Sequence, residues 1–319
     1  MNSDVLYRNL FEHMINGFAH CEVVYKGNIA VDWIYLKVNP KFELLTGLKD
    51  VEGRLVSEVI PGIHRDNPEL LEMYSAVAET MVADYIEVHI KELLMWFSVT
   101  AFSHKKNTFT TVFENTTLRK AMEHEIRQKN IILSETLDET IEAWAIALEL
   151  RDIETLGHSS RVVEIALRLG RQLGIDEEQI GVLKRGGLLH DIGKMGIPDA
   201  ILLKKDALTL EETEIIKTHP RIAYEMLHKI PLLDPIRDIP YCHHERWNGT
   251  GYPQGLLGER IPRLARIFAI VDVYDALTSD RPYREAWSKS RAIAYIANER
   301  GISFDPEVAD AFVGMMEED

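Results

Sequence analysis

Hydrophobic and polar residues alternate along the first third of the chain in the manner of β-strands. Five runs rich in β-branched and aromatic residues lie at Cys21–Tyr25, Ala30–Leu36, Tyr85–Ile90, Leu94–Phe102 and Thr108–Phe113. The first two flank Lys26-Gly27-Asn28, a plausible hairpin turn. Glycines and prolines punctuate a helical or irregular stretch before the last three runs. This order predicts an α+β domain with an antiparallel sheet over residues 1–115.

Between Thr116 and Leu156 the chain has neither glycine nor proline, and its apolar residues recur at helical steps of three and four. One helix over this stretch would be about 60 Å long. The segment 116–145 has too few apolar residues at its start for a buried helix. We therefore expect a parallel dimeric coiled coil linking two domains, with a single solvated helix as the alternative.

Helical patterns dominate residues 146–319 and predict an all-α domain. Thr209-Leu-Glu-Glu212 fits a capping box that opens a helix. We expect this helix to end near His219, because Pro220 disfavours helical geometry in the residue before it. Ile261–Leu277 is predicted to form a long apolar helix.

The candidate chemistry begins with His190 and Asp191, which are neighbours at the end of an apolar run and form a potential metal-binding pair. Lys194, three residues beyond the aspartate, could meet an anionic substrate. Glu154 and His158 are four residues apart and would share one face of a helix covering both.

More potential ligands follow in His219, the tandem pair His243-His244, and Asp272. Asp272 lies between Val271 and Val273, and a buried carboxylate costs roughly several kcal/mol unless a cation compensates it. The alternative is a carboxylate turned to solvent. Together the five imidazoles and three carboxylates exceed the needs of one metal ion, and two metals about 3.5–4 Å apart can stabilise in-line displacement at phosphorus.

The bulk composition narrows the function classes. Hydrophobic residues make up 46% and charged residues 27% of 319, typical of a globular protein with room for two domains. A formal net charge of −15 argues against broad binding to DNA. Cys21 and Cys242 form no spaced set, and neither a signal pattern nor a membrane-spanning stretch is evident. We therefore expect a cytoplasmic protein that does not bind membranes.

The N-terminal region resembles a PAS sensor domain. Asn39-Pro40-Lys-Phe42-Glu-Leu-Leu-Thr46-Gly47 is similar to the family's helix after the second strand, and Glu114-Asn-Thr-Thr-Leu-Arg119 to its exit from the last strand. Glu114 and Asn115 replace the usual aspartate and apolar residue. The resemblance leaves open whether this domain binds a ligand or is a dimerisation module with a filled core.

The C-terminal region, about residues 140–319, resembles the HD-GYP family of cyclic dinucleotide phosphodiesterases. The motifs that carry this resemblance are Glu154-x-x-x-His158, His190-Asp191-x-x-Lys194, His219, His243-His244, Gly251-Tyr252-Pro253, Asp272 and Phe304-Asp305-Pro306. The family implies a helical bundle around a metal cluster, with Asp191 as the bridging carboxylate. Since an acidic residue at position 154 accompanies a third metal in the family, we expect two or three divalent ions. The resemblance favours iron or manganese, with zinc, nickel or magnesium as alternatives.

The resemblance also implies substrate contacts. It assigns Arg281 and Arg284 to the phosphates of the dinucleotide, although surface ion pairs are the alternative for both. Lys194 suits a phosphate oxygen. In the loop Gly251-Tyr252-Pro253, the aromatic ring could stack on guanine. The family's loop is also linked to diguanylate cyclase binding. Asn248 replaces a usual aspartate, which puts one loop contact in doubt.

The sequence therefore predicts a PAS-regulated, metal-dependent phosphodiesterase that converts cyclic di-GMP to pGpG or GMP, with Asp191 and Lys194 as catalytic residues and a homodimeric assembly. Two alternatives remain. One is a related phosphohydrolase for another cyclic dinucleotide or a mononucleotide. The other is a non-catalytic receptor or interaction module.

Overall fold

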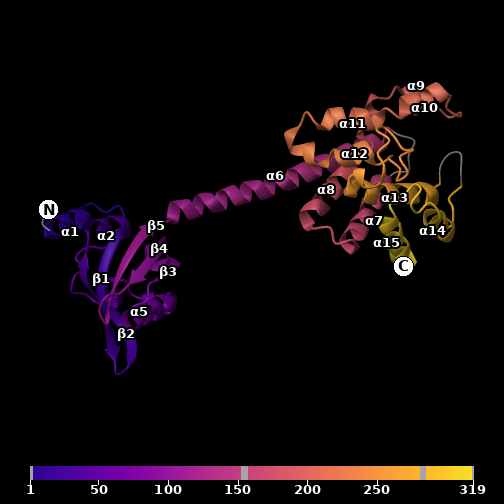
Figure 1. Ribbon diagram of the computed structural model, residues 1–319. Helices are drawn as coiled ribbons and strands as arrows, with labels where there is room; N and C mark the ends of the chain where they lie inside the picture. The colour runs from indigo at the N-terminus through magenta and orange to yellow at the C-terminus, as the bar shows by residue number, and fades with distance from the viewer. Residues whose placement is uncertain (1–2, 152–156, 281–284, 318–319) are drawn as a thin grey trace. The chain divides into compact units, whose positions relative to one another are not determined.

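The computed structural model spans residues 1–319 and describes 3–151, 157–280 and 285–317. The chain divides into two compact units, Met1–Ile131 and Ile132–Asp319 (Figure 1). The first unit contains an antiparallel sheet and the second is helical. None of the helices in the described ranges is both long and apolar enough to cross a membrane.

The first unit is built on a five-stranded antiparallel sheet with the strand order β2-β1-β5-β4-β3. The strands are β1 (Gly17–Lys26), β2 (Ile29–Val38), β3 (Asp84–Ile90), β4 (Met95–Phe102) and β5 (Thr108–Asn115). All five predicted strands are confirmed, each within a few residues of its expected bounds. The hairpin turn is also confirmed, with Gly27 at φ 66°, a conformation that favours glycine.

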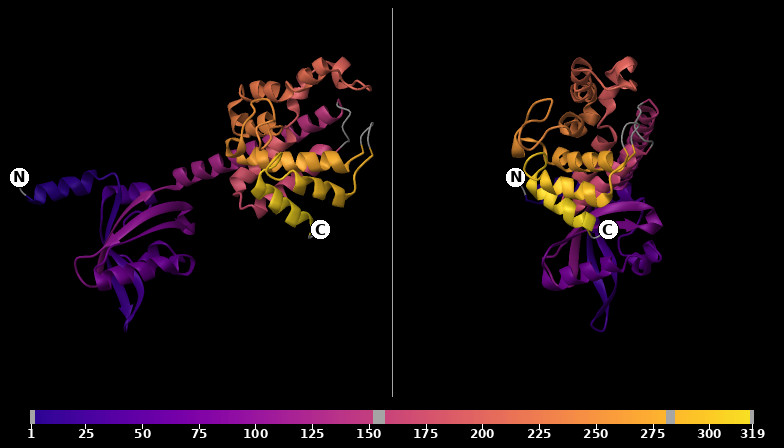
Figure 2. Two further views of the ribbon diagram at one scale, coloured as in Figure 1. Left: turned by 45° about the vertical axis from the view of Figure 1, so that its right-hand side comes forward. Right: turned by 90° about the vertical axis from the view of Figure 1, so that its right-hand side faces the viewer.

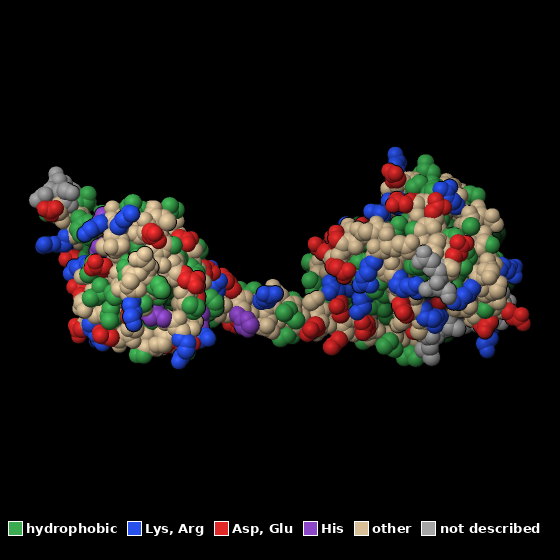
Figure 3. Space-filling model, turned by 90° about the horizontal axis from the view of Figure 1, so that it is seen from below, with side chains coloured by type: hydrophobic (Ala, Val, Ile, Leu, Met, Phe, Trp, Pro, Cys, Tyr) green, Lys and Arg blue, Asp and Glu red, His purple; other side chains and the backbone are tan. Residues whose placement is uncertain are grey.

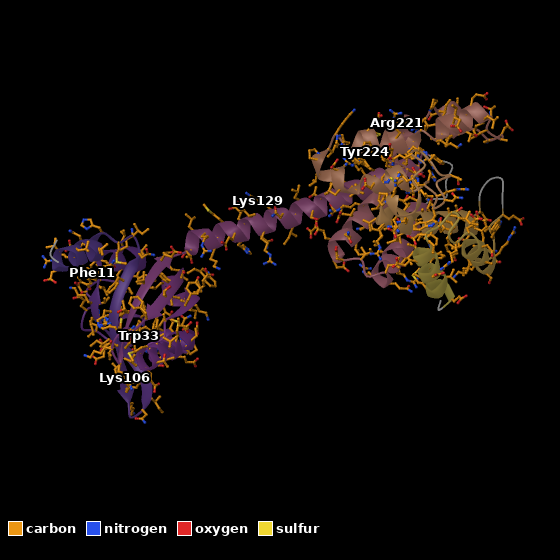
Figure 4. All side chains as sticks on the ribbon, in the orientation of Figure 1. Phe11, Trp33, Lys106, Lys129, Arg221 and Tyr224 are labelled. Atoms are coloured by element: carbon orange, nitrogen blue, oxygen red, sulfur yellow. The ribbon has the colours of Figure 1, made fainter. Side chains whose placement is uncertain are left out.

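Helices precede the sheet and fill the interval between β2 and β3. They are α1 (Ser3–His13), α2 (Pro40–Thr46), α3 (Val56–Val59), α4 (Ile63–Asp66) and α5 (Pro68–Thr80), while the 3₁₀ turn η1 (Lys91–Leu93) connects β3 and β4. Helix α5 packs against the sheet, where Tyr74 stacks on Phe109 at 4.4 Å between ring centroids. Trp33, labelled in Figure 4, meets Tyr74 edge-on at 5.0 Å. This aromatic core encloses a cavity of about 70 Å³.

Asn39 joins β1, β2 and α2 through one buried side chain. Its Oδ1 accepts hydrogen bonds from the backbone N–H groups of Phe42 and Phe18, each at 2.9 Å. Its Nδ2 donates to the carbonyl of Asn16 at 3.0 Å. Asn39 is therefore both the N-cap of α2 and a tie to the start of β1.

Helix α6 (Thr117–Glu149) belongs to both units. Leu118, Met122 and Ile126 are each more than half exposed, and hydrophobic side chains are visible along this part of the helix in Figure 3. Lys129, labelled in Figure 4, is also exposed and pairs with Glu125. Towards the C-terminal end Ile141, Ala145 and Leu148 are buried.

The long helix is shorter than predicted. Expected to run from Thr116 to Leu156, it ends at Glu149, because the chain turns there and the Glu149 carboxylate accepts the N–H groups of Gly157 and Ser159. The last five residues of the expected helix, 152–156, lie outside the described residues.

The second unit packs helices around one apolar core (Figure 2). Its longer helices are α7 (His158–Gln172), α8 (Glu177–Leu188), α11 (His219–Leu227), α13 (Arg263–Thr278), α14 (Lys289–Asn298) and α15 (Pro306–Glu317). Shorter ones are η2 (Ile192–Gly196), α9 (Asp199–Leu202), α10 (Leu210–Ile216), η3 (Pro231–Ile236), α12 (Asp238–Cys242) and η4 (Gly258–Arg260). Phe268 on α13 is fully buried at the centre of this core.

The predicted capping box at Thr209 and Glu212 is confirmed, as is the apolar helix near Ile261–Leu277, which is α13. The end expected near His219 is displaced. Helix α10 stops at Ile216, and His219 begins α11 with Pro220 in its first turn. Proline is well tolerated there, because the N–H it lacks has no partner within a helix at that position.

We predict that Asn39→Ala lowers the free energy of unfolding of the sheet unit by roughly 2–3 kcal/mol, since a helix cap and two further buried hydrogen bonds are lost. Chemical denaturation of the full chain, followed by tryptophan fluorescence, measures this loss. Asn130→Ala, on an exposed stretch of α6, is the control. A change below about 0.5 kcal/mol in the Asn39 variant would contradict the role assigned to this side chain.

Candidate metal centre

Seven of the eight predicted metal ligands come together in the helical unit. They form two groups in which the potential ligand atoms lie within 4.8 Å of one another: Asp191, His219, His243 and His244, and His158, His190 and Asp272. The eighth, Glu154, lies outside the described residues. The single helix expected to carry Glu154 and His158 is interrupted at Gly157, whose φ of 82° is not helical.

Asp191 lies where the two groups meet. One carboxylate oxygen, Oδ1, is 3.2 Å from His219 Nε2 and 3.9 Å from His243 Nε2. The other oxygen, Oδ2, is 3.1 Å from His190 Nε2 and 2.8 Å from Lys194 Nζ. The two oxygens of this buried side chain therefore face different imidazoles, Oδ1 those of His219 and His243 and Oδ2 that of His190.

Helix ends deliver most of these side chains to one place. His158 and His219 are the first residues of α7 and α11, His190 and Asp191 follow α8, His243 and His244 follow α12, and Asp272 lies within α13. The contact between η2 and α11 is very close. A Cβ on Gly193 would lie 1.9 Å from the carbonyl oxygen of His219, so only glycine fits at this position.

Backbone carbonyls orient three of the imidazoles. The Nδ1 atoms of His190, His219 and His243 lie 2.8–3.0 Å from the carbonyl oxygens of Gly187, Ile216 and Pro240, respectively. Because a carbonyl can only accept, each Nδ1 must carry a proton and donate. The Nε2 atoms consequently point into the centre, an arrangement typical of metal-bound histidines.

The fourth imidazole, His158, is oriented by a carboxylate. Its Nδ1 donates to Asp275 Oδ2 at 2.6 Å, and Arg161 holds the same carboxylate with contacts of 3.0 Å to each oxygen. Burial opposes ionisation of Asp275, but the bonds from His158 and Arg161 lower its pKa. Asp275 thus remains a carboxylate that fixes the ring of His158.

Asp272 is turned inward. Its Oδ1 lies 3.4 Å from His158 Nε2 and 4.0 Å from His190 Nε2, and its side chain is 15% exposed. The alternative of a solvent-facing carboxylate is wrong. Although burial opposes its ionisation, His158 and the neighbouring imidazoles hold the pKa of Asp272 well below its usual range.

The electrostatics of the centre favour anionic carboxylates and neutral imidazoles at His243 and His244; at His190 burial opposes protonation, but the neighbouring Asp191 carboxylate raises the pKa. Burial raises the pKa of Asp191, but Lys194 and His190 outweigh this effect and hold the pKa well below its usual range. Burial lowers the pKa of His243 well below its ordinary value, helped by His244 and His190, and lowers that of His244 to about 4. Neutral imidazoles and ionised carboxylates are the forms that bind metal ions.

The donor set fits divalent cations. Asp191 Oδ1 and the Nε2 atoms of His190, His219 and His243 are buried without a hydrogen-bond partner among the described residues. Since each Nδ1 carries the proton, the Nε2 lone pairs face carboxylate oxygens at short range, and such contacts are unfavourable unless a cation lies between them. Neither ligand group found among the described residues contains a cysteine, so imidazole nitrogen and carboxylate oxygen are the available ligands, which suit iron, manganese and zinc.

A groove of about 480 Å³ lies beside the centre. Tyr252 lines it and stacks on His244 with 4.7 Å between ring centroids. Lys217 Nζ lies 5.8 Å from the centroid of the Tyr252 ring. Because His244 covers one face of this ring, a base could stack only on the part that remains open. The groove offers space for a ligand larger than a single phosphate.

The loop that carries Tyr252 is held by Glu245, a residue that the sequence reasoning did not single out. Its buried carboxylate accepts the backbone N–H groups of Gln254 and Leu256, at 2.7 and 2.9 Å. Gly251 packs so closely here that a Cβ would lie 2.3 Å from the nitrogen of Arg246. Gly251 and Tyr252 line the groove, and the expected substrate contacts of Gly251, Tyr252 and Pro253 remain predictions.

Two further expectations concern Asn248 and the pair Arg281 and Arg284. Asn248 Oδ1 accepts bonds from the N–H and hydroxyl of Thr250, so the loop contact that its replacement of aspartate put in doubt is made by the amide oxygen. Arg281 and Arg284 lie outside the described residues. Their expected phosphate contacts therefore remain predictions.

Sequence reasoning also missed Asp275 and Arg161. Both lie three residues after a predicted ligand, Asp272 and His158, on the same helices. Spacing of this kind puts side chains on one helix face and could have indicated supporting residues.

The helical unit thus surrounds a buried cluster of imidazoles and carboxylates that could hold metal ions. The sequence profile of the HD domain family matches residues 144–308. The chain belongs to this family.

Several curated relatives each match a little over half of the chain. The cyclic di-GMP phosphodiesterase response regulator RpfG of Xanthomonas campestris pv. campestris is 44% identical over 177 residues, which is 55% of this chain and 47% of RpfG. A cyclic di-GMP phosphodiesterase of Thermotoga maritima is 39% identical over 57% of this chain and 50% of its own length. The 3'3'-cGAMP-specific phosphodiesterase 2 of Vibrio cholerae is 36% identical over 56% of this chain and 34% of its own length. The matched region thus spans about half the length of these relatives or less.

We predict that Asp275→Asn weakens metal binding by about 10–100-fold, because the asparagine NH₂ or a lost charge disturbs the bond that orients His158. Metal titration of chelator-treated protein measures the affinity. Asp310→Asn is the matched control, since Asp310 is also held by an arginine, Arg300, but on an exposed surface. Equal affinities in the two variants would contradict an orienting role for Asp275.

Proposed function

We propose that this protein is a metal-dependent phosphodiesterase that hydrolyses cyclic di-GMP to pGpG or GMP. The observation that carries the proposal is Asp191, a buried carboxylate whose Oδ1 faces the imidazoles of His219 and His243 while Oδ2 faces that of His190. This geometry suits a bridging ligand between two cations. The names of the relatives from Xanthomonas and Thermotoga support the choice of reaction and substrate.

The proposed ligands are the seven clustered side chains, with Glu154 as a further ligand if three ions bind. Divalent iron or manganese would supply Lewis-acid stabilisation of charge at phosphorus and activation of water when bound; zinc, nickel or magnesium are alternatives. The chain's own contribution is to fix the ligand geometry and the proton positions on the imidazoles. Lys194, 2.8 Å from Asp191, is proposed to stabilise charge on a phosphate oxygen of the substrate.

The groove beside the centre is proposed to hold the rest of the dinucleotide. Tyr252 would contact a guanine, with Gly251 and Pro253 shaping the loop around it. Arg281 and Arg284 would bind phosphate. The same loop is proposed as a contact for a diguanylate cyclase.

A hybrid cyclic dinucleotide is the second candidate substrate. Support comes from the Vibrio relative, whose name specifies 3'3'-cGAMP. The two substrates share the phosphodiester and differ in one base, so the groove rather than the metal ligands would discriminate between them.

The proposal predicts that protein prepared anaerobically with iron or manganese linearises cyclic di-GMP. His190→Ala combined with Asp191→Ala should reduce the rate at least about 10³-fold, because both groups of ligands lose a member. Chromatography of the products measures turnover and distinguishes pGpG from GMP, and 3'3'-cGAMP tests the second substrate.

The matched control is His228→Ala combined with Asp234→Ala, which removes another histidine–aspartate pair, 2.9 Å apart and exposed. Full turnover in the His190/Asp191 variant would rule out the assignment. Tight binding without turnover in the wild type would indicate a receptor instead.

We further propose that residues 1–115 form a PAS-like sensor, 116–145 a coiled-coil linker and 146–319 the hydrolase, with the sensor regulating activity. Two strands, a helical middle and three strands support the first assignment. The exposed apolar residues Leu118, Met122, Ile126 and Leu133 support the second, since pairing with another copy of α6 would bury them.

A homodimer through the sensor and linker follows from this proposal. Met122→Asp combined with Ile126→Asp should shift the protein from dimer to monomer at micromolar concentration, because two carboxylates would be buried in the seam. Sedimentation velocity measures the change. The control, His124→Asp with Gln128→Asp, puts the same charges two residues further on, on another face of the helix. A monomeric wild type, or equal dissociation of both variants, would contradict the coiled coil.

A further inference from the structure

Glu149, the last residue of α6, and Arg151, two residues beyond it, contact two segments that border the metal centre. We propose that Arg151 and Glu149 are positioning residues, Arg151 for the loop that carries Lys194 and Glu149 for the helix end that carries His158. The proposal rests on the proposed function for its catalytic consequence, but its structural content stands on the contacts alone.

Arg151 holds the segment from Lys194 to Asp199 at several points. Its guanidinium donates to the carbonyl oxygens of Lys194 and Ile197, at 3.1 and 2.9 Å. It also contacts the Asp199 carboxylate at 2.7 and 3.2 Å. A planar guanidinium that spans two carbonyls and a carboxylate fixes the path of the backbone between them, which the single ammonium group of a lysine does only in part.

The backbone held by Arg151 is the one from which Lys194 reaches Asp191. On its other side, Gly193 packs directly against the backbone of α11 at His219. The segment around Lys194 is therefore held on one side by α11, through Gly193, and on the other side by Arg151. The side chain of Lys194 is 11% exposed, so a shift of its backbone cannot be absorbed by free rotation in solvent.

Glu149 performs the corresponding task for α7. Its two carboxylate oxygens accept the N–H groups of Gly157 and Ser159 at 2.8 and 2.9 Å, on either side of His158. Burial opposes ionisation of Glu149, but these bonds lower its pKa. A carboxylate at the N-terminus of a helix also interacts favourably with the helix dipole.

The α6 end is itself firmly anchored in the helical unit. Ile141 and Ala145 are part of the apolar core, Leu148 is also buried, and Lys184 of α8 pairs with Glu142 at 3.0 Å. Partly exposed ion pairs such as Arg151–Asp199 contribute little to stability on their own. The carbonyl and N–H contacts beside the metal centre, rather than the charge pair, are what these two residues add.

The test uses the full, metal-loaded chain and three variants, Arg151→Ala, Arg151→Lys and Glu149→Gln. We expect Arg151→Ala to keep its metal content and its KM for cyclic di-GMP within about twofold while kcat falls at least about tenfold, since Lys194 is displaced but no ligand is removed. Hydrogen exchange of the amides at 192–197 should accelerate. Glu149→Gln should instead accelerate exchange at 157–160. Arg151→Lys should retain part of the kcat that Arg151→Ala loses. It replaces Arg151→Ala in the test if the alanine variant does not fold.

The matched control is Arg263→Ala, which likewise removes a guanidinium bonded to a carbonyl, that of Leu173, and to the carboxylate of Glu307. It should change neither kcat nor exchange at 192–197. An Arg151→Ala variant that behaves like this control would overturn the proposal. If the wild type hydrolyses no cyclic dinucleotide, the proposed function fails, while exchange and metal content still decide whether Arg151 and Glu149 position the two segments.

Discussion

The helical unit depends on a buried cluster in which acceptor atoms face one another. Asp191 Oδ1 and the Nε2 atoms of His190, His219 and His243 have no hydrogen-bond partner among the described residues, and each lies in the interior. In a protein interior, unpaired groups of this kind cost several kcal/mol together. A bound cation removes that cost, because lone pairs that repel one another become ligands of the same ion. The cluster is thus unfavourable as a piece of core packing and favourable as a metal site.

The fold makes this arrangement possible by using the ends of helices. The last carbonyls of a helix have no partner within it, and those near the ends of α8, α10 and α12 accept the Nδ1 protons of His190, His219 and His243. The same contact satisfies the backbone and sets the tautomer. Two short helices take part directly, since α10 supplies a carbonyl at its end and α12 supplies a carbonyl and is followed by His243 and His244.

The sequence predicted the strands of the sheet and the set of clustered ligands well. Alternation defined β1 to β5, and the spacing of His190, Asp191 and Lys194 indicated a local site. It could not predict that α6 ends at Glu149, because the bonds that turn the chain join Glu149 to Gly157 and Ser159 across a segment with good helical pattern. Contacts far apart in sequence, such as His158 with Asp275, were likewise invisible to periodicity.

The residues that the sequence did not predict share one property. They contact the side chains and backbone around the proposed metal ligands and are not proposed as ligands themselves. Asp275 orients a ring, Glu245 holds a loop, and Arg151 and Glu149 hold the segments beside Lys194 and His158. Carboxylates and guanidinium groups are common on protein surfaces, so composition alone does not single these residues out, although the three-residue step from Asp272 to Asp275 is a possible signal. Only geometry separates them from pairs such as Arg300 and Asp310, whose contacts join two exposed side chains. The geometry of the metal centre therefore depends on residues other than the proposed ligands. Helix α6, which belongs to both units, provides one of them in Glu149.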